Sequence, residues 1–234
     1  MTDSEKLIIY KSCVKNVRSH EKAFKAINMV INNCMSKNDM EGEKIHTKIA
    51  ALLFCSWAES FFKKLIHTPH GFTTSEIIRI NKVTNVYGKW IKCLEIASAK
   101  IATDDNATKQ HIKEYFESLC KEYIEKPSHL RNRIAHGQIE IALNSTNTAI
   151  NIDLTNKLEN LNIVTILQWK SVFELVSQGI LYLIESWSKR GPEGYTQKVE
   201  EINTRMASVE SWTIEKKREN IQRKKRFQAT ERYS

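Results

Sequence analysis

Glycine and proline are scarce in this chain, with seven and three copies among 234 residues. Since these residues supply most turns and helix interruptions, we expect long secondary-structure elements joined by few turns. No uninterrupted apolar run reaches 18 residues, which argues against a membrane span. The N-terminal MTDSEKLIIYKSC lacks the basic segment, apolar core and cleavage site of a signal peptide. These absences predict a cytoplasmic protein.

The patterns that usually announce disulfides or metal sites are also missing. The five cysteines are odd in number, widely spaced and never form C-x-x-C, which favours buried, reduced thiols over a disulfide framework. The chain has no H-E-x-x-H motif and no evident carboxylate cluster. His67 and His70 form an H-x-x-H pair, but Pro69 separates them and no third ligand is near in sequence. We therefore expect no metal and no cofactor.

Positive charge is in excess and concentrates at the C-terminus. The net charge is +9, and residues 215–234 contain eight Lys and Arg residues against three Glu residues. Such a segment favours an anionic partner, nucleic acid before a membrane surface. The alternative is a solvated basic helix without a dedicated ligand. The candidate RNA-binding residues are Lys216, Lys217, Arg218, Arg223, Lys224, Lys225 and Arg226.

Apolar residues recur with helical spacing along most of the chain. This spacing predicts helices over residues 4–36, 44–67, 75–102, 107–125, 129–137, 157–188 and 195–228. Between them, QIEIALN and TAINIDL alternate polar and apolar residues around a turn-like STN, which predicts a β-hairpin. The expected fold is an all-α bundle (residues 1–190) with this small hairpin, followed by a basic helical extension (191–234).

One short stretch, LRNRIAHG, concentrates side chains that can act chemically. At about 100° per residue, a helix would turn Leu130, Ile134 and Gly137 towards the core. The outward arc would hold Arg131, Asn132 and His136, with only the small Ala135 between them. Gly137 suits the left-handed position just past a helix end.

This arrangement has two interpretations. A guanidinium can bind a phosphate, an imidazole can transfer a proton near neutral pH, and Asn132 can orient either group. Alternatively, Arg131 and His136 merely decorate a helix whose C-terminal dipole favours a histidine. Glu59 lies inside the apolar segment IAALLFCSWAESFFKKLI, so it needs a partner, and Arg131 is a candidate for that partner. His129 beside the motif is a weaker candidate for a catalytic role.

The segment from Arg131 to His136 resembles the R-x-x-x-x-H signature of HEPN domains, and LRNRIAHG is similar to the form found in the RiboL-PSP-type and MAE-type HEPN groups. WAESFFKKL is similar to the second long HEPN helix, which often carries an acidic residue, here Glu59. The segment after the motif resembles the short hairpin of some of these groups. The resemblance covers roughly residues 1–190.

The resemblance implies a metal-independent endoribonuclease that works as a homodimer. Two copies of the motif would meet in a composite site, and attack by the ribose 2′-hydroxyl would leave a 2′,3′-cyclic phosphate. The catalytic residues would be Arg131 and His136 with Asn132, and Glu59 would support them. HEPN nucleases occur in toxin–antitoxin, phage-defence and RNA-processing systems, which implies RNA as a partner and a separate antitoxin or sensor protein. The alternative is a non-catalytic RNA-binding or adaptor protein of the same fold.

Overall fold

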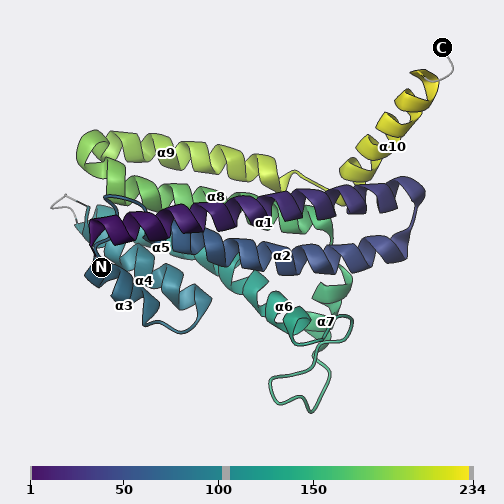
Figure 1. Cartoon of the computed structure of the whole chain (residues 1–234), viewed down its shortest axis with the longest axis horizontal. Coiled ribbons are helices and arrows are strands. Elements are labelled where there is room, and N and C mark those ends of the chain that lie inside the picture. Colours follow the sequence, from purple (N-terminus) through teal and green to yellow (C-terminus); the bar gives the residue numbers. More distant parts are fainter. Residues whose placement is uncertain (1, 102–105, 232–234) are drawn as a thin grey trace.

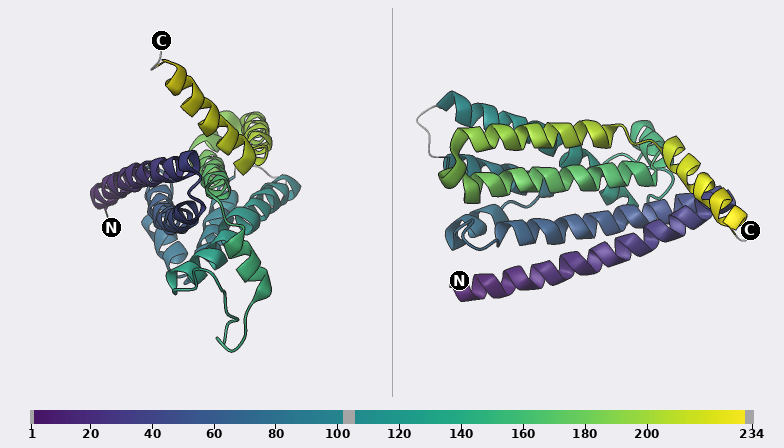
Figure 2. Two further views of the ribbon diagram at one scale, coloured as in Figure 1. Left: turned by 90° about the vertical axis from the view of Figure 1, so that its right-hand side faces the viewer. Right: turned by 90° about the horizontal axis from the view of Figure 1, so that it is seen from above.

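The protein folds as an elongated helical bundle (Figure 1). The computed structural model describes residues 2–101 and 106–231, with the side chains of 186–188 and 226–231 outside that description. Two long antiparallel helices open the chain, α1 (Asp3–Lys37) and α2 (Met40–Ile66). Their long axes run alongside those of α8 (Ile163–Leu181) and α9 (Trp187–Glu210), as the right-hand view of Figure 2 shows. Within the described residues, no helix is both long enough and apolar enough to cross a membrane.

Shorter helices cover the bundle along its other side (Figure 1). They are α3 (Thr74–Asn81), α4 (Val86–Ala99), α5 (Asn106–Cys120), α6 (Lys126–Ala135) and α7 (Ile152–Glu159). The predicted helix at 75–102 is thus two helices, and its expected last residue lies outside the described part. Thr73 caps the start of α3 with a capping box. The Thr73 hydroxyl accepts from the Glu76 backbone N–H, and the Glu76 carboxylate accepts from the Thr73 backbone N–H.

Aromatic side chains from three helices form the centre of the core. The Trp57 ring of α2 and the Trp90 ring of α4 both contact Phe173 of α8, with centroid distances of 5.3 and 4.7 Å. All three residues are at most 2% exposed. The strongly apolar second helix is therefore central, as its composition predicts.

α5 and α6 form one continuous helical segment, joined by a π-helical turn at Lys121–Glu125. The sequence suggests instead that Pro127 ends one helix and Ser128 caps the next. A proline ring clashes with the carbonyl four residues earlier in a regular α-helix, and a wider turn just before it accommodates the ring without ending the helix. The Ser128 hydroxyl caps nothing and donates back to the Glu125 carbonyl, 2.6 Å away.

The predicted β-hairpin does not form two strands in the described part of the chain. Residues 138–151 form a loop with one antiparallel bridge between Leu143 and Ile150, beside which the Asn144 and Asn151 N–H groups donate to the Ala149 and Ala142 carbonyls, both at 2.8 Å. A side chain satisfies a further backbone group: Gln138 Oε1 accepts from the Leu143 N–H at 2.8 Å. Ile150 stays exposed, so a hairpin here would bury little apolar surface to stabilise it. The second expected strand instead starts α7, capped by the side chain of Asn151.

The C-terminal extension splits into two helices with different roles. Gly191, at φ +56°, interrupts α9, in the predicted break at 190–194. After that break α9 packs on the bundle and buries Tyr195, Ile202, Met206 and Val209 in the common core. The last helix, α10 (Ile214–Glu231), crosses the end of α1 and α2 and projects away from the bundle (Figures 1 and 2).

Candidate functional site

The end of α6 fixes the position of His136. Gly137 adopts φ +80°, its N–H donates to the Ile134 carbonyl at 3.1 Å, and the Gln138 N–H donates to the Arg133 carbonyl at 2.9 Å. These two bonds form a Schellman motif, the usual way a helix ends at glycine. His136 is therefore the C-cap residue of α6, just past Ala135, and its side chain is exposed. Gly137 ends the helix as expected, but it is exposed and does not face the core.

Arg131 faces α2. Its Nη1 lies 3.0 Å from Glu59 Oε1, which is the pairing that the sequence suggested. The Arg131 side chain is 23% exposed, whereas that of Glu59 is 47% exposed, so the ion pair lies at the edge of the core. The buried Arg131 Nε has no hydrogen-bond partner in the structure. Leu130 and Ile134 pack in the core on the neighbouring face of α6, as expected.

Asn132 and His136 lie on a different face of α6. With about 100° per residue, the Arg131 direction differs from that of His136 by about 140°. Both Asn132 and His136 are exposed, and among the described residues no side-chain hydrogen bond links either of them to Arg131 or to each other. The expectation of one shared outward arc is therefore wrong for Arg131: the guanidinium turns to the carboxylate of α2, while the imidazole faces solvent.

Two further residues share the His136 side of the helix: His129, the weaker catalytic candidate, and Arg133, to which the sequence analysis gave no role. Arg133 and His129 line a groove of about 590 Å³ between α6, α7 and α8, whose wall includes the partly buried Trp169. The same helical geometry could have found them, since His129 and Arg133 fall within about 60° of His136. Lys126 and Lys157 line the groove as well, each paired with an acidic residue of its own helix. The groove thus combines an aromatic surface with Arg133, whose side chain has no acidic partner among the residues that the structure describes.

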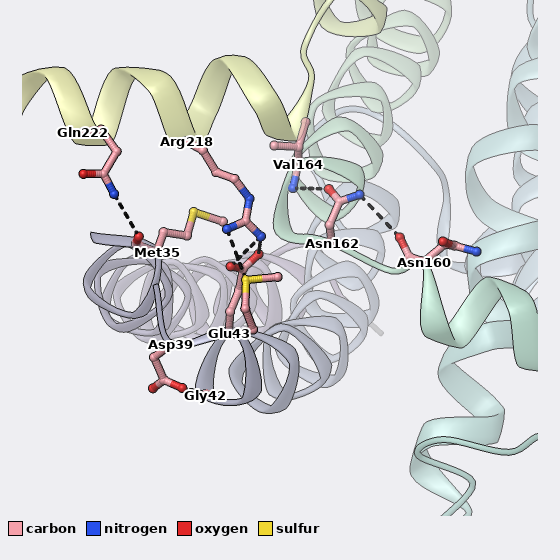
Figure 3. A network of polar contacts seen from close by, with 10 residues as sticks. Met35, Asp39, Gly42, Glu43, Asn160, Asn162, Val164, Arg218 and Gln222 are labelled. Atoms are coloured by element: carbon pink, nitrogen blue, oxygen red, sulfur yellow. Dashed lines mark hydrogen bonds and ion pairs between the residues drawn. The ribbon is translucent and has the colours of Figure 1, made fainter. Parts of the chain in front are cut away.

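The basic residues of α10 are divided between anchoring contacts and exposure. Arg218 Nη2 lies 2.8 and 2.7 Å from the two carboxylate oxygens of Glu43, a residue that is only 6% exposed (Figure 3). Gln222 Nε2 and Lys225 Nζ donate to the Met35 and Ser36 carbonyls at 3.3 and 2.9 Å. These carbonyls end α1, where the helix dipole favours positive charge.

The remaining predicted RNA-binding residues have weaker contacts with the protein. Lys217 Nζ lies 3.5 Å from Asn28 Oδ1, and burial lowers its pKa. Lys216 and Arg223 are exposed and bond only to groups close by in sequence, and Lys224 is exposed. The side chain of Arg226 lies outside the described residues. The basic segment is thus partly an anchor and partly a free positive surface.

Metal and thiol chemistry find little support in the described part of the chain. No three His, Cys, Asp or Glu side chains come together there in a way that could hold a metal ion. His67 is buried with Nδ1 2.7 Å from the Lys63 carbonyl, whereas His70 is exposed. All five cysteines are free and buried, as predicted. Burial raises the pKa of the Cys55 thiol to about 12, which leaves it protonated at neutral pH.

Compared with models of protein families, with curated proteins and with solved structures, the chain matches none of them.

Proposed function

We propose that this protein is a metal-independent endoribonuclease of HEPN type, acting as a homodimer in a toxin, phage-defence or RNA-processing system. The observation that carries the proposal is the arrangement on α6. Glu59 holds Arg131 at the helix surface, and a Schellman motif presents His136 unobstructed to solvent one turn further. In the proposed reaction Arg131 stabilises charge on the scissile phosphate. His136 transfers a proton to or from the 2′-hydroxyl or the leaving oxygen, and Asn132 orients a reacting group.

The divergence of Arg131 and His136 supports a site completed by a second copy. One copy of the motif contributes a single imidazole, that of His136, whereas cleavage by acid–base chemistry is best served by two proton-transfer groups. A two-fold axis beside α6 would bring the His136 of a second copy to this site.

An exposed aliphatic stripe beside the motif suits such a contact. Ile45, Ile49 and Leu52 are all exposed on α2, at the spacing that aligns side chains on one helix face. Glu59 follows Leu52 by seven residues, so the stripe leads towards the Glu59–Arg131 pair. Covering it would bury apolar surface close to the proposed site.

RNA cleavage in EDTA tests the activity. We expect the wild type to cut labelled RNA and to leave 2′,3′-cyclic phosphate ends, and His136→Ala and Arg131→Ala to lose activity by at least about 100-fold. His111→Ala, at an exposed position of α5, is the matched control and stays active. A 2′-deoxy substitution at the cut nucleotide blocks the reaction. Cleavage that requires a divalent ion, or that survives His136→Ala, rules out this mechanism.

A sedimentation measurement tests the dimer separately. We expect a dimer mass at micromolar protein, and a monomer for Leu52→Glu, in which a charge enters the aliphatic stripe. Ile78→Glu, which changes an exposed aliphatic residue of α3, is the control and stays dimeric. A wild-type monomer contradicts the composite site.

The second candidate is a non-catalytic RNA-binding or adaptor protein. The same divergence favours it if no second copy completes the site, because Arg131 and His136 do not act on one point within a single chain. Arg133 and the partly buried Trp169 of the groove would then serve binding alone. RNA binding without cleavage of any RNA, unaffected by His136→Ala and weakened by Arg133→Ala, supports this alternative.

A further inference from the structure

A second hollow lies where α10 crosses the bundle, built from residues of α1, α8 and α10. Its volume is about 400 Å³, and Val164, Leu167 and Ile221 form its apolar part. The segment between α9 and α10 closes one side with Trp212. None of its lining residues belongs to α6, so it is separate from the proposed catalytic site.

Three lysines converge on this hollow: Lys216, Lys217 and Lys224 line it, and no Asp or Glu of the described residues does. Burial lowers the pKa of Lys217, Glu43 outside the lining partly offsets this shift, and the nearby Lys224 lowers the pKa again by a smaller amount. Like charges that meet in a partly dry hollow repel one another, and an anion bound between them would offset that repulsion.

The hollow also contains an unsatisfied acceptor. Asn32 Oδ1 is shielded from solvent and has no hydrogen-bond partner in the structure, and Asn32 lines the hollow. A buried acceptor without a donor is destabilising, because it has lost its hydrogen bonds to water and gained none in return. A ligand that carries hydroxyl or amino donors beside its anionic group would satisfy both Asn32 and the lysines.

The walls of the hollow are held in place by contacts outside it. Gln168 Nε2 donates to the Val209 and Trp212 carbonyls at 3.0 and 3.1 Å, which fixes the α9–α10 connection on α8. The Arg218–Glu43 pair fixes α10 over the start of α2 (Figure 3). A site whose walls are already positioned binds without a large ordering cost.

We propose that this hollow binds a nucleoside phosphate. The phosphate lies among Lys216, Lys217 and Lys224. The base packs against Trp212 and the apolar wall, and a sugar hydroxyl or base amine donates to Asn32 Oδ1. Free nucleotides and a nucleotide within an RNA chain share this chemistry. The inference does not depend on the proposed cleavage, because the site uses no residue of α6.

Titration calorimetry with AMP, ATP, inorganic phosphate and a short oligoribonucleotide tests the site. The full-length His136→Ala protein is used, so that cleavage cannot consume the oligonucleotide. We expect a nucleotide to bind with one site per chain, and Lys224→Ala to weaken its binding about tenfold. Lys25→Ala removes one positive charge from an exposed position of α1 outside the hollow, and we expect it to change binding by less than about twofold.

Two further variants test the hollow without relying on lysine removal. Asn32→Asp keeps the shape of the side chain but places a carboxylate among the lysines, so binding is lost. Asn33→Asp, at an exposed position of the same helix, retains binding. Trp212→Ala weakens the binding of nucleotides but not that of inorganic phosphate.

The pattern of outcomes separates the ligand sources and can overturn the proposal. AMP or ATP binding that Asn32→Asp abolishes supports a free-nucleotide site. If only the oligonucleotide binds and Asn32→Asp abolishes its binding, the hollow holds one nucleotide of a bound RNA chain. Equal losses in Lys25→Ala and Lys224→Ala, or no binding of any probe, overturn the proposal. Equal affinity for inorganic phosphate and nucleotides overturns the role of the base.

Discussion

Arg131 of α6 and Glu59 of α2 form an ion pair across 72 residues of sequence, with Nη1 3.0 Å from Oε1. The pair joins the central helix of the bundle to the helix that carries the candidate motif. It sets the direction of the guanidinium, because Arg131 is mostly buried and has no other carboxylate partner in the described residues. Glu59, half-exposed, leaves one side of the pair open to a ligand.

Replacing Glu59 with glutamine separates the positioning role of this pair from its contribution to stability. The pair is partly exposed, so the loss in unfolding free energy is about 1 kcal/mol or less. We expect RNA cleavage to fall much more, by at least about tenfold, because Arg131 loses the group that orients it. Urea denaturation and the EDTA cleavage assay measure the two effects.

Glu122→Gln is the matched control for this prediction. Its carboxylate pairs with Lys126 near the start of α6, and both side chains are largely exposed. It should leave cleavage unchanged. Equal cleavage by wild type and Glu59→Gln would remove Glu59 from the site and leave it a structural contact.

The buried thiols predict a loss of stability at alkaline pH. Burial raises the pKa of Cys55 to about 12 and holds the pKa of Cys93 and Cys120 far above the usual range. In the unfolded chain these thiols ionise near pH 8.5. Their stabilising effect is therefore complete below about pH 8.5 and is lost as the pH rises towards 12, since the unfolded state alone releases protons.

Urea denaturation at pH 8.5 and 9.5 measures this effect where thiols of the unfolded chain titrate and most tyrosine side chains, with a pKa of about 10, stay protonated. We expect the free energy of unfolding to decrease by about 1 kcal/mol for each of the three thiols between these two pH values. Cys120→Ala should lower the pH dependence, whatever it does to stability at pH 7. If the free energy of unfolding depends on pH identically in Cys120→Ala and in the wild type, the Cys120 thiol has the same pKa in the folded and the unfolded state.

Much of the fold follows from the spacing of apolar residues, because burial of one helix face is a local pattern. The long helices α1, α2 and α8 and the break near Gly191 are visible in the sequence for this reason. The predicted hairpin is reduced to one antiparallel bridge because alternation alone does not provide a surface to pack against. The Gln138 side chain bonds the backbone beside this bridge.

The candidate site was predictable in its residues but not in its directions. The Glu59–Arg131 pair follows from a carboxylate on an apolar helix that needs a cation. Sequence spacing could not show that Arg131 turns towards α2 and away from His136, because that depends on how α6 packs. Nor could it show that Arg218 folds back onto the buried Glu43, an acid 175 residues earlier.

The Arg218–Glu43 pair predicts that α10 detaches when the pair is broken. Glu43→Gln removes the negative charge that holds Arg218 against the bundle, while the amide keeps the shape of the side chain. A weakening of about 1.4 kcal/mol raises the detached population about tenfold. Trypsin should therefore cut the basic segment 216–225 about ten times faster, with the remaining bundle intact by mass spectrometry.

Glu219→Gln, an exposed acidic position on α10, provides the control and should be cut at the wild-type rate. The melting temperature of the bundle should change little in Glu43→Gln, because α10 can detach while the core stays folded. Unchanged cleavage in Glu43→Gln would mean that the contacts of Gln222 and Lys225 with the end of α1 hold α10 alone.

Gly179 tests the tightness of the core where α8 meets α5. A Cβ at this position would lie 2.2 Å from Phe116 Cζ, and the Phe116 side chain is completely buried. Alanine gains about 1 kcal/mol of helix propensity, but overpacking costs about 1–3 kcal/mol. We expect Gly179→Ala to lower the free energy of unfolding by about 1–2 kcal/mol.

Gly137→Ala provides a comparison without crowding, since nothing lies within 4 Å of its Cβ. It loses about 1 kcal/mol only through its φ of +80°. Combining Gly179→Ala with Phe116→Leu should restore part of the loss, and a stabilised Gly179→Ala protein would show that α8 and α5 can move apart.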